Sequence, residues 1–194
     1  MITDLTREFD AHGATLRWDR WGADDDGTPF VLCHGFSGSS HDFALHIESL
    51  AAKRPVVSID HRGHGRSQKL ADTTAYSIDQ LTADLIAFVD SEIGGPIDLL
   101  GHSMGGSMAL RFTLARPDLV RSLILMDTSG WSFLPPDGPV AEMMRSFISA
   151  FDPAGGLPDL TALAGPEEAL INAATTPEWQ AMKQQMPRHS TRTR

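Results

Sequence analysis

The residues with the clearest chemical potential are Gly101-His102-Ser103-Met104-Gly105, which match the pattern G-x-S-x-G. An apolar run over 97–100 precedes them, and a helix-like stretch over 105–116 follows. A sharp turn from strand into helix would hold the serine in a strained backbone conformation that exposes its Oγ. The helix N-terminus would favour the negative charge that develops during acyl transfer. This context predicts a nucleophile at Ser103, against the alternative of a glycine-rich turn with an incidental serine.

A second segment that could assist acyl transfer is HGFSG at 34–38, directly after an apolar run over 29–33. An oxyanion hole needs a loop N–H near the end of an early strand, in addition to the N–H that follows the nucleophile. We therefore expect the backbone N–H groups of Phe36 and Met104 to donate to the oxyanion. Taken by itself, the segment fits a plain glycine turn better than an oxyanion loop.

Histidines concentrate around a third segment, DHRGHGRS at 60–67. His61 and His64 raise the alternative of a metal site, but no third ligand near them has a helical or hairpin metal spacing. The glycines fit a tight loop in which Asp60 and the arginines make structural hydrogen bonds, so no metal is predicted. A phosphate-binding loop is excluded, since the sequence contains neither G-x-x-x-x-G-K-[ST] nor G-x-G-x-x-G.

Alternating strand and helix patterns over 1–130 would position these segments. The expected strands are 5–9, 14–21, 29–33, 56–59, 97–100 and 119–126, and the first two predict a β-hairpin. Helices are expected over 40–52, over 105–116, and between a cap at Ser77 or Asp79 and the breaker at 94–96. Apolar strands separated by helices indicate an α/β fold, with a mostly parallel sheet covered by helices on both faces.

Three segments together, VLCHGFSGSS, SIDHRGHGRS and LLGHSMGGSMAL, resemble the α/β-hydrolase fold superfamily in their order and composition. The similarity continues through LVRSLILMDTSG and covers roughly residues 5–130. GHSMGG and DHRGHGRS are typical of the lipase, esterase, lactonase and C–C hydrolase branches. The resemblance implies a serine nucleophile at Ser103, an oxyanion hole at Phe36 and Met104, and no cofactor. It is weaker for the haloalkane dehalogenase and epoxide hydrolase branches, whose nucleophile is a carboxylate.

The resemblance also suggests how the chain divides into domains. Residues 1–130 correspond to the N-terminal part of the hydrolase core, residues 131–187 to a helical lid inserted after the sixth strand, and 188–194 to a disordered tail. In the family the triad follows the order serine, acid, histidine, and the last two usually lie on strands beyond the lid. Neither strand occurs in this sequence, so we expect an α/β-hydrolase that is truncated within its lid.

Two residues of the chain are candidates for the missing roles of acid and base. Asp127 ends the last expected strand, a position that some branches use for the acid, and its alternative role is structural. His189 is the only histidine after Ser103 and is the candidate base, although it lies in a polar tail without an apolar anchor.

The overall composition limits which classes of binding partner, and which cellular location, we expect for the protein. The 194 residues carry 16 Lys and Arg against 25 Asp and Glu, a formal charge of −9, which disfavours binding to nucleic acid and to anionic membranes. The single cysteine, Cys33, excludes an internal disulfide and a multi-cysteine zinc site. Because no leader and no membrane-spanning run is visible, the expected location is the cytoplasm.

Three functions remain open on this sequence. The first is a serine hydrolase that cleaves a small-molecule ester, lactone or related carbonyl substrate through an acyl-enzyme. The second is a C–C bond hydrolase or an acyltransferase on the same scaffold. The third is a non-catalytic or incomplete α/β-hydrolase-like protein. An unpaired apolar edge on the strand over 119–126 would also invite self-association.

Overall fold

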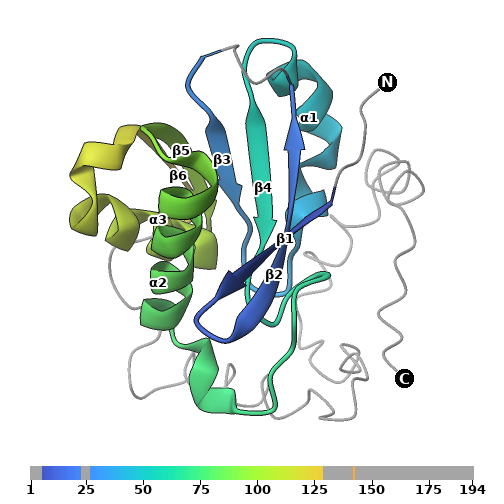
Figure 1. Ribbon diagram of the computed structural model, residues 1–194, viewed down its shortest axis with the longest axis vertical. Coiled ribbons are helices and arrows are strands. Elements are labelled where there is room, and N and C mark those ends of the chain that lie inside the picture. The colour runs from blue at the N-terminus through green and yellow to red at the C-terminus, as the bar shows by residue number, and fades with distance from the viewer. Residues whose placement is uncertain (1–5, 23–26, 129–141, 143–194) are drawn as a thin grey trace. The chain divides into compact units, whose positions relative to one another are not determined.

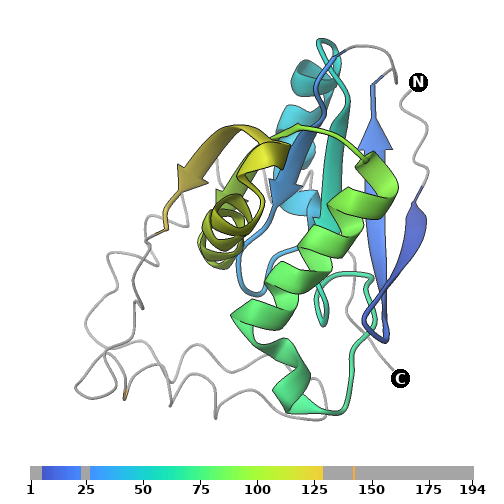
Figure 2. The ribbon, with the colours of Figure 1, turned by 60° about the vertical axis from the view of Figure 1, so that its left-hand side comes forward.

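A single twisted sheet organises the part of the chain that the structure describes. The computed structural model describes residues 6–22, 27–128 and 142, nearly all of which belong to one compact unit, Met1–Trp131. These residues form a six-stranded sheet with helices packed on both faces (Figures 1 and 2). The lid predicted over 131–187 and the tail predicted over 188–194 lie outside the described residues, except for Glu142.

Strands and helices alternate along the described chain. The strands are β1 (Arg7–Ala11), β2 (Ala14–Trp21), β3 (Phe30–Cys33), β4 (Val56–Asp60), β5 (Ile97–His102) and β6 (Val120–Met126). The α-helices are α1 (Ala44–Ala51), α2 (Ile78–Phe88) and α3 (Met104–Ala115), and the short helical turns are η1 (Ser40–Phe43), η2 (Thr73–Tyr76), η3 (Val89–Ile93) and η4 (Pro117–Leu119). Each strand and helix expected from the sequence before residue 128 is therefore present, with ends shifted by a few residues.

The strand order is β1-β2-β4-β3-β5-β6. Strands β1 and β2 form the predicted antiparallel hairpin, which turns at His12 and Gly13, both with positive φ. Strand β2 also pairs antiparallel with β4, whereas β4, β3, β5 and β6 are all parallel to their neighbours. The predicted α/β fold with a mostly parallel sheet is confirmed.

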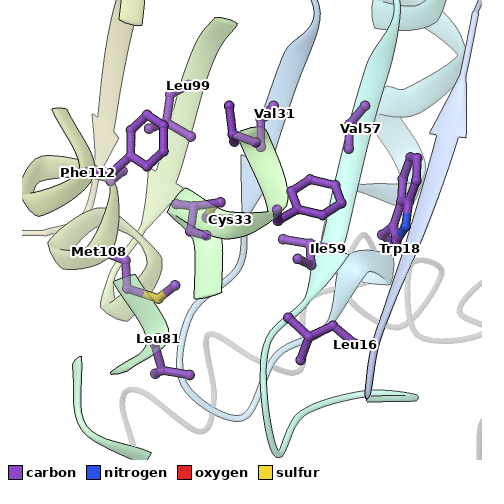
Figure 3. Close-up of a cluster of buried hydrophobic side chains, with 14 of the residues drawn as sticks. Leu16, Trp18, Val31, Cys33, Val57, Ile59, Leu81, Leu99, Met108 and Phe112 are labelled. Atoms are coloured by element: carbon purple, nitrogen blue, oxygen red, sulfur yellow. The ribbon is translucent and has the colours of Figure 1, made fainter. Parts of the chain in front are cut away.

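Alternating residues of the central strands feed two separate apolar layers. On β3, Val31 and Cys33 face the layer that contains α2 and α3, while Phe30 and Leu32 face the layer that contains η1 and α1. Figure 3 shows part of the larger layer. Its buried members include side chains from the hairpin, the sheet and both helices: Leu16, Trp18, Val31, Cys33, Val57, Ile59, Leu81, Leu99, Met108 and Phe112. Both faces of the sheet are thus buried, as expected for parallel strands.

Single residues define the ends of α2. The side chain of Ser77 accepts a hydrogen bond from the Gln80 N–H at 3.1 Å and caps the helix, so the cap is Ser77 rather than Asp79. Beyond Phe88 the chain continues through the π-helical turn η3 and stops at Gly94, whose φ is 70°. No described helix has the length and apolar character that crossing a bilayer requires.

Candidate active site

The turn between β5 and α3 holds Ser103 in an unusual backbone conformation. Its φ is 50° and its ψ is −114°, a region that costs a residue with a Cβ about 1–3 kcal/mol. Four hydrogen bonds to the Ser103 backbone hold it there. The N–H donates to the Met126 carbonyl at 2.9 Å, and the carbonyl accepts from Thr128 Oγ1 at 2.8 Å. The same carbonyl accepts from the N–H groups of Gly106 at 3.0 Å and Ser107 at 3.1 Å.

Glycines surround Ser103 because other parts of the backbone approach too closely for a side chain. A Cβ on Gly101 would lie 2.4 Å from the Gly105 carbonyl oxygen, and a Cβ on Gly105 would lie 2.4 Å from the Cys33 carbonyl oxygen. A Cβ on Gly106 would lie 2.4 Å from the side chain of Thr128. The G-x-S-x-G spacing is therefore explained by packing: these positions let α3 start directly against the ends of β3 and β6.

The loop after β3 lies beside this turn, because β3 and β5 are neighbours and Cys33 pairs with Gly101. A Cβ on Gly35 would lie 3.3 Å from the Ser103 Cβ and 3.0 Å from His102 Nδ1. The loop then reverses in a tight turn, in which the Gly38 N–H donates to the Gly35 carbonyl at 3.1 Å and Ser37 has a φ of 62°. The two segments that the sequence analysis selected are thus in contact.

The two expected oxyanion donors lie on either side of this contact. Met104 is the first residue of α3, and the first N–H groups of a helix have no acceptor within the helix. Phe36 is the second residue of the tight turn, and its side chain is 54% exposed, with its ring 5.8 Å from the His64 ring in an edge-to-face arrangement. The donor role of both N–H groups stays a prediction.

The rings of three histidines pack against one another in tilted arrangements next to the Gly35 loop. The ring of His34 lies 4.2 Å from the ring of His61 and 5.3 Å from the ring of His64, measured between centroids. His34 and His61 are buried. Burial lowers the pKa of His34, and a neighbouring His64 charge would act in the same direction. The pKa of His61 is lowered further, again by burial first and then by His34 and His64. Both rings are therefore neutral at pH 7.

Asp60 and Arg66 brace the loop that carries His61 and His64. Asp60 is the last residue of β4, is fully buried, and accepts hydrogen bonds from the Ser40 N–H at 2.6 Å and from Arg66 Nε at 2.9 Å. Burial alone would raise the pKa of Asp60, but these hydrogen bonds and the Arg66 charge outweigh it and lower the pKa. Arg66 also forms an ion pair with Asp19 on β2. The structural role expected for Asp60 and an arginine is confirmed.

Asp127, the candidate acid, follows β6 at the same edge of the sheet as Ser103. It lies between Met126 and Thr128, the two residues that are hydrogen-bonded to the Ser103 backbone. It is exposed and has a φ of 47°. Among the described residues, neither the Asp127 carboxylate nor Ser103 Oγ has a hydrogen-bond partner. His189, the candidate base, lies outside the residues that the structure describes.

The sequence did not predict a metal at the histidines. In the structure, three ring nitrogens of His34 and His64 lie within hydrogen-bond distance of backbone groups. His34 Nδ1 lies 2.7 Å from the Gly35 carbonyl oxygen, and its Nε2 lies 3.1 Å from the His61 backbone nitrogen. His64 Nδ1 lies 2.9 Å from the Arg62 carbonyl oxygen. Over residues 6–22 and 27–128, no group of three or more His, Cys, Asp or Glu side chains is arranged to hold a metal ion.

Two residues of this candidate site were not predicted from the sequence. Thr128 closes the Ser103 turn through its hydroxyl, and His34 holds the neighbouring loop through both ring nitrogens. The only signal for either was its place directly after an apolar strand of the sheet. That signal does not specify a partner, because partners 25 or 27 residues away are set by strand pairing rather than by local spacing.

The sheet order and the strained serine between strand and helix define a class of protein, and the comparison of sequences agrees. Residues 28–174 match the family model described as the alpha/beta hydrolase fold. The chain belongs to the α/β-hydrolase fold family, and the resemblance found in the sequence is confirmed.

The match to each individual relative spans only part of that relative's length. A dihydrolipoyllysine-residue acetyltransferase component of an acetoin cleaving system, from Pseudomonas putida, is 36% identical over 61% of this chain and 31% of that protein. An sn-1-specific diacylglycerol lipase, ABHD11 of Danio rerio, is 35% identical over 61% of this chain and 37% of that protein. The solved structure of Est816, an N-acyl homoserine lactone degrading enzyme, is 28% identical, with a TM-score of 0.61 over 73% of this chain and 52% of that one. The chain therefore spans about half or less of these relatives' length.

Proposed function

We propose that this chain is a serine hydrolase, or the nucleophile-bearing part of one, that acts on a small-molecule ester, lactone or related carbonyl compound. The observation that carries the proposal is the strained φ of Ser103, held by four hydrogen bonds at the start of a helix. Strained backbone conformations of this kind cluster at functional sites, where they aim a reactive side chain. The lipase and lactone-degrading names among the relatives support the same substrate class.

The proposed reaction begins when Ser103 Oγ attacks the carbonyl carbon of the substrate and transfers its proton to a base. The N–H groups of Phe36 and Met104 would stabilise the oxyanion of the tetrahedral intermediate. Collapse of that intermediate breaks the bond to the leaving alcohol, which receives the proton, and leaves an acyl-enzyme. Water then attacks the acyl carbon in a second round, which releases the acid and restores Ser103. Each step conserves protons without any cofactor.

The test of this proposal compares the full chain with Ser103→Ala in the hydrolysis of a 4-nitrophenyl ester. We expect Ser103→Ala to lower the rate at least about 1000-fold, because the nucleophile is lost. Ser107→Ala is the matched control, since it removes a serine hydroxyl from the same turn of α3 and keeps the backbone N–H that bonds to the Ser103 carbonyl. Equal rates for the full chain and Ser103→Ala would remove the proposal.

The identity of the base is a separate proposal. If the chain is active by itself, we propose His189 as the base and Asp127 as the acid that orients it. Labelling of Ser103 with a fluorophosphonate would then be strong and would be lost in His189→Ala. Strong labelling that survives His189→Ala assigns the base elsewhere. Weak labelling of the full chain favours the expectation that the acid and base are supplied by sequence beyond this chain.

Two alternatives have their own support. The acetyltransferase name of the Pseudomonas putida relative favours transfer of the acyl group to an acceptor other than water. A screen with acyl-CoA donors and with vinylogous diketones separates acyl transfer and C–C hydrolysis from ester hydrolysis. A non-catalytic ligand binder is the alternative if the chain lacks the acid and base of the family's triad. Ligand-dependent stabilisation without turnover would identify that function.

We also propose that the chain self-associates through β6. This strand is at the edge of the described sheet, and three consecutive apolar residues on it are exposed: Ile124, Leu125 and Met126. An apolar edge with unpaired backbone groups can pair with the same edge of a second copy.

A further inference from the structure

His34 carries a proton on a defined ring nitrogen. Its Nδ1 faces the Gly35 carbonyl oxygen at 2.7 Å, and its Nε2 faces the backbone N–H of His61 at 3.1 Å. A carbonyl oxygen can only accept a hydrogen bond, and a backbone N–H can only donate one. Nδ1 must therefore be protonated and Nε2 must be bare. His34 is a neutral imidazole in one tautomer, and it is fully buried.

The Gly35 carbonyl is part of the peptide unit that contains the Phe36 N–H. In a trans peptide, the C=O and N–H groups point in opposite directions across the same plane. Any contact that fixes the direction of the Gly35 oxygen therefore fixes the direction of the Phe36 N–H. Two donors hold this oxygen, His34 Nδ1 at 2.7 Å and the Gly38 N–H at 3.1 Å. The first donor belongs to a rigid buried ring and the second belongs to a turn on the surface side.

This peptide unit is also adjacent to the nucleophile. A Cβ added to Gly35 would lie only 3.3 Å from the Ser103 Cβ, so the unit begins close to the serine. A rotation of the peptide unit about its flanking bonds would exchange the N–H for the carbonyl. The group facing the reacting oxygen would then be an acceptor, which repels an oxyanion.

We infer that His34 is a positioning residue for the oxyanion hole: as the Nδ1–H tautomer it holds the Gly35 carbonyl and so orients the Phe36 N–H toward the reaction at Ser103. The inference rests on the proposed function, because it assigns His34 a part in that site. His34 does not touch the substrate in this role. It acts through one peptide unit.

The surroundings of His34 maintain this protonation state. The groups that face it are the rings of His61 and His64 and, at longer range, the carboxylates of Asp42 and Asp60. Burial, and secondarily His64, lower the pKa of His34 more than the Gly35 hydrogen bond and the carboxylates of Asp42 and Asp60 raise it, so the pKa of His34 is lowered. A protonated His34 would also bring its Nε2–H against the His61 N–H, where two donors would face each other.

The tautomer can be measured without catalysis, on the full chain labelled with ¹⁵N-histidine. Two-bond ¹H–¹⁵N correlations distinguish the Nδ1–H tautomer from the commoner Nε2–H tautomer. We expect the His34 signals of a neutral Nδ1–H ring at pH 7, while the exposed His46 serves as the internal reference. An Nε2–H pattern or a charged ring for His34 overturns the inference.

The positioning role is tested by two substitutions that each keep one half of the ring's hydrogen bonding. His34→Asn retains a donor near the Nδ1 position, and His34→Gln retains an acceptor near the Nε2 position. Loss of one oxyanion donor costs about 100- to 1000-fold in kcat. We expect His34→Gln to lose kcat in about this range with little change in KM, and His34→Asn to lose at least about tenfold less. His46→Gln is the control for a surface histidine.

The outcomes separate this inference from the proposed function. Turnover that depends on Ser103, together with equal losses of kcat in the two His34 variants, leaves the hydrolase intact and overturns the positioning role. A loss that appears mainly in KM does the same. Absence of any Ser103-dependent turnover in the unsubstituted chain removes the proposed function, and the role of His34 falls with it. A melting temperature measured for each variant identifies losses that are due only to unfolding.

Discussion

At the residue scale, two features distinguish the candidate site: glycines that have no side chain beside Ser103, and buried histidine rings that carry no charge. The glycines beside Ser103 are required because backbone carbonyls occupy the space of their side chains. His34 and His61 are buried as neutral rings although histidine is half protonated near pH 6.5 in water. The effect of each feature on stability can be measured, by adding a methyl group at a glycine or by lowering the pH.

The first prediction concerns Gly105. In Gly105→Ala the new methyl group would lie 2.4 Å from the Cys33 carbonyl oxygen, so α3 must shift away from β3. We expect a loss of about 1–3 kcal/mol in the free energy of unfolding, as for other overpacked sites. Urea denaturation followed by circular dichroism measures the loss. Gly95→Ala is the control, since a Cβ at Gly95 has no neighbour within 4 Å. A Gly105→Ala variant as stable as Gly95→Ala would contradict the packing described here.

The second prediction concerns pH. Because the pKa values of His34 and His61 are lowered in the folded state, the unfolded chain binds more protons than the folded chain below about pH 6.5. The free energy of unfolding should therefore fall as the pH falls below that value, by up to about 1.4 kcal/mol per pH unit for each histidine. It should level out only below the lowered pKa values.

Urea denaturation of the full chain between pH 7 and pH 5 measures this slope. His34→Asn removes one of the two buried titrating rings and should reduce the slope, while His46→Asn, at an exposed position, should leave it unchanged. Identical slopes for the two variants would show that His34 is charged in the folded state or does not contribute.

At the scale of elements, the edge of the sheet that carries Ser103 is formed by parallel strands that end together. Strands β4, β3, β5 and β6 all point the same way, so the residues after each of them meet at one edge of the sheet. A buried ion pair connects the loop after β4 to helix α2. Arg62, in the loop after β4, donates from Nε and NH2 to the two carboxylate oxygens of Asp84 on α2, each at 2.8 Å. It also donates to the Ala11 carbonyl at the hairpin turn at 2.9 Å.

The third prediction tests this connection. Asp84→Ala would leave the Arg62 guanidinium buried without its counter-charge, since both side chains are only 3% exposed. Breaking such a pair typically costs about 3–5 kcal/mol, so we expect a large fall in the melting temperature. Asp79→Ala is the matched control on the same helix, because its ion pair with Arg111 is on the surface. Equal melting temperatures for the two variants would refute the role of Asp84.

At the scale of the whole molecule, the described sheet ends in an apolar strand. Leu125 is 43% exposed, and its neighbours Ile124 and Met126 are 46% and 40% exposed. Because consecutive residues of a strand point to opposite faces, both faces of β6 are uncovered at this end. An apolar edge of this kind can pair with the same edge of a second copy.

The fourth prediction follows from that edge. We expect the average mass from sedimentation equilibrium to rise with protein concentration for the full chain. The double substitution Ile124→Lys with Leu125→Lys should remove the rise, because a charge on each face opposes edge pairing. Leu114→Lys is the control, since Leu114 is 76% exposed but lies on α3, away from the edge. A concentration-independent monomer mass for the full chain would exclude self-association.

The sequence alone determined the class of fold and the position of Ser103, the proposed nucleophile, between a strand and a helix. Periodicity is local, so alternating apolar segments located the strands and helices, and the G-x-S-x-G spacing between a strand and a helix located Ser103. Only the tertiary structure decided which distant groups hold Ser103. The Met126 carbonyl and the Thr128 hydroxyl reach Ser103 because β6 pairs with β5, and His34 reaches the His61 N–H because β3 pairs with β4. Hydrogen bonds between residues more than 20 positions apart depend on strand order, and no local pattern of residues encodes that order.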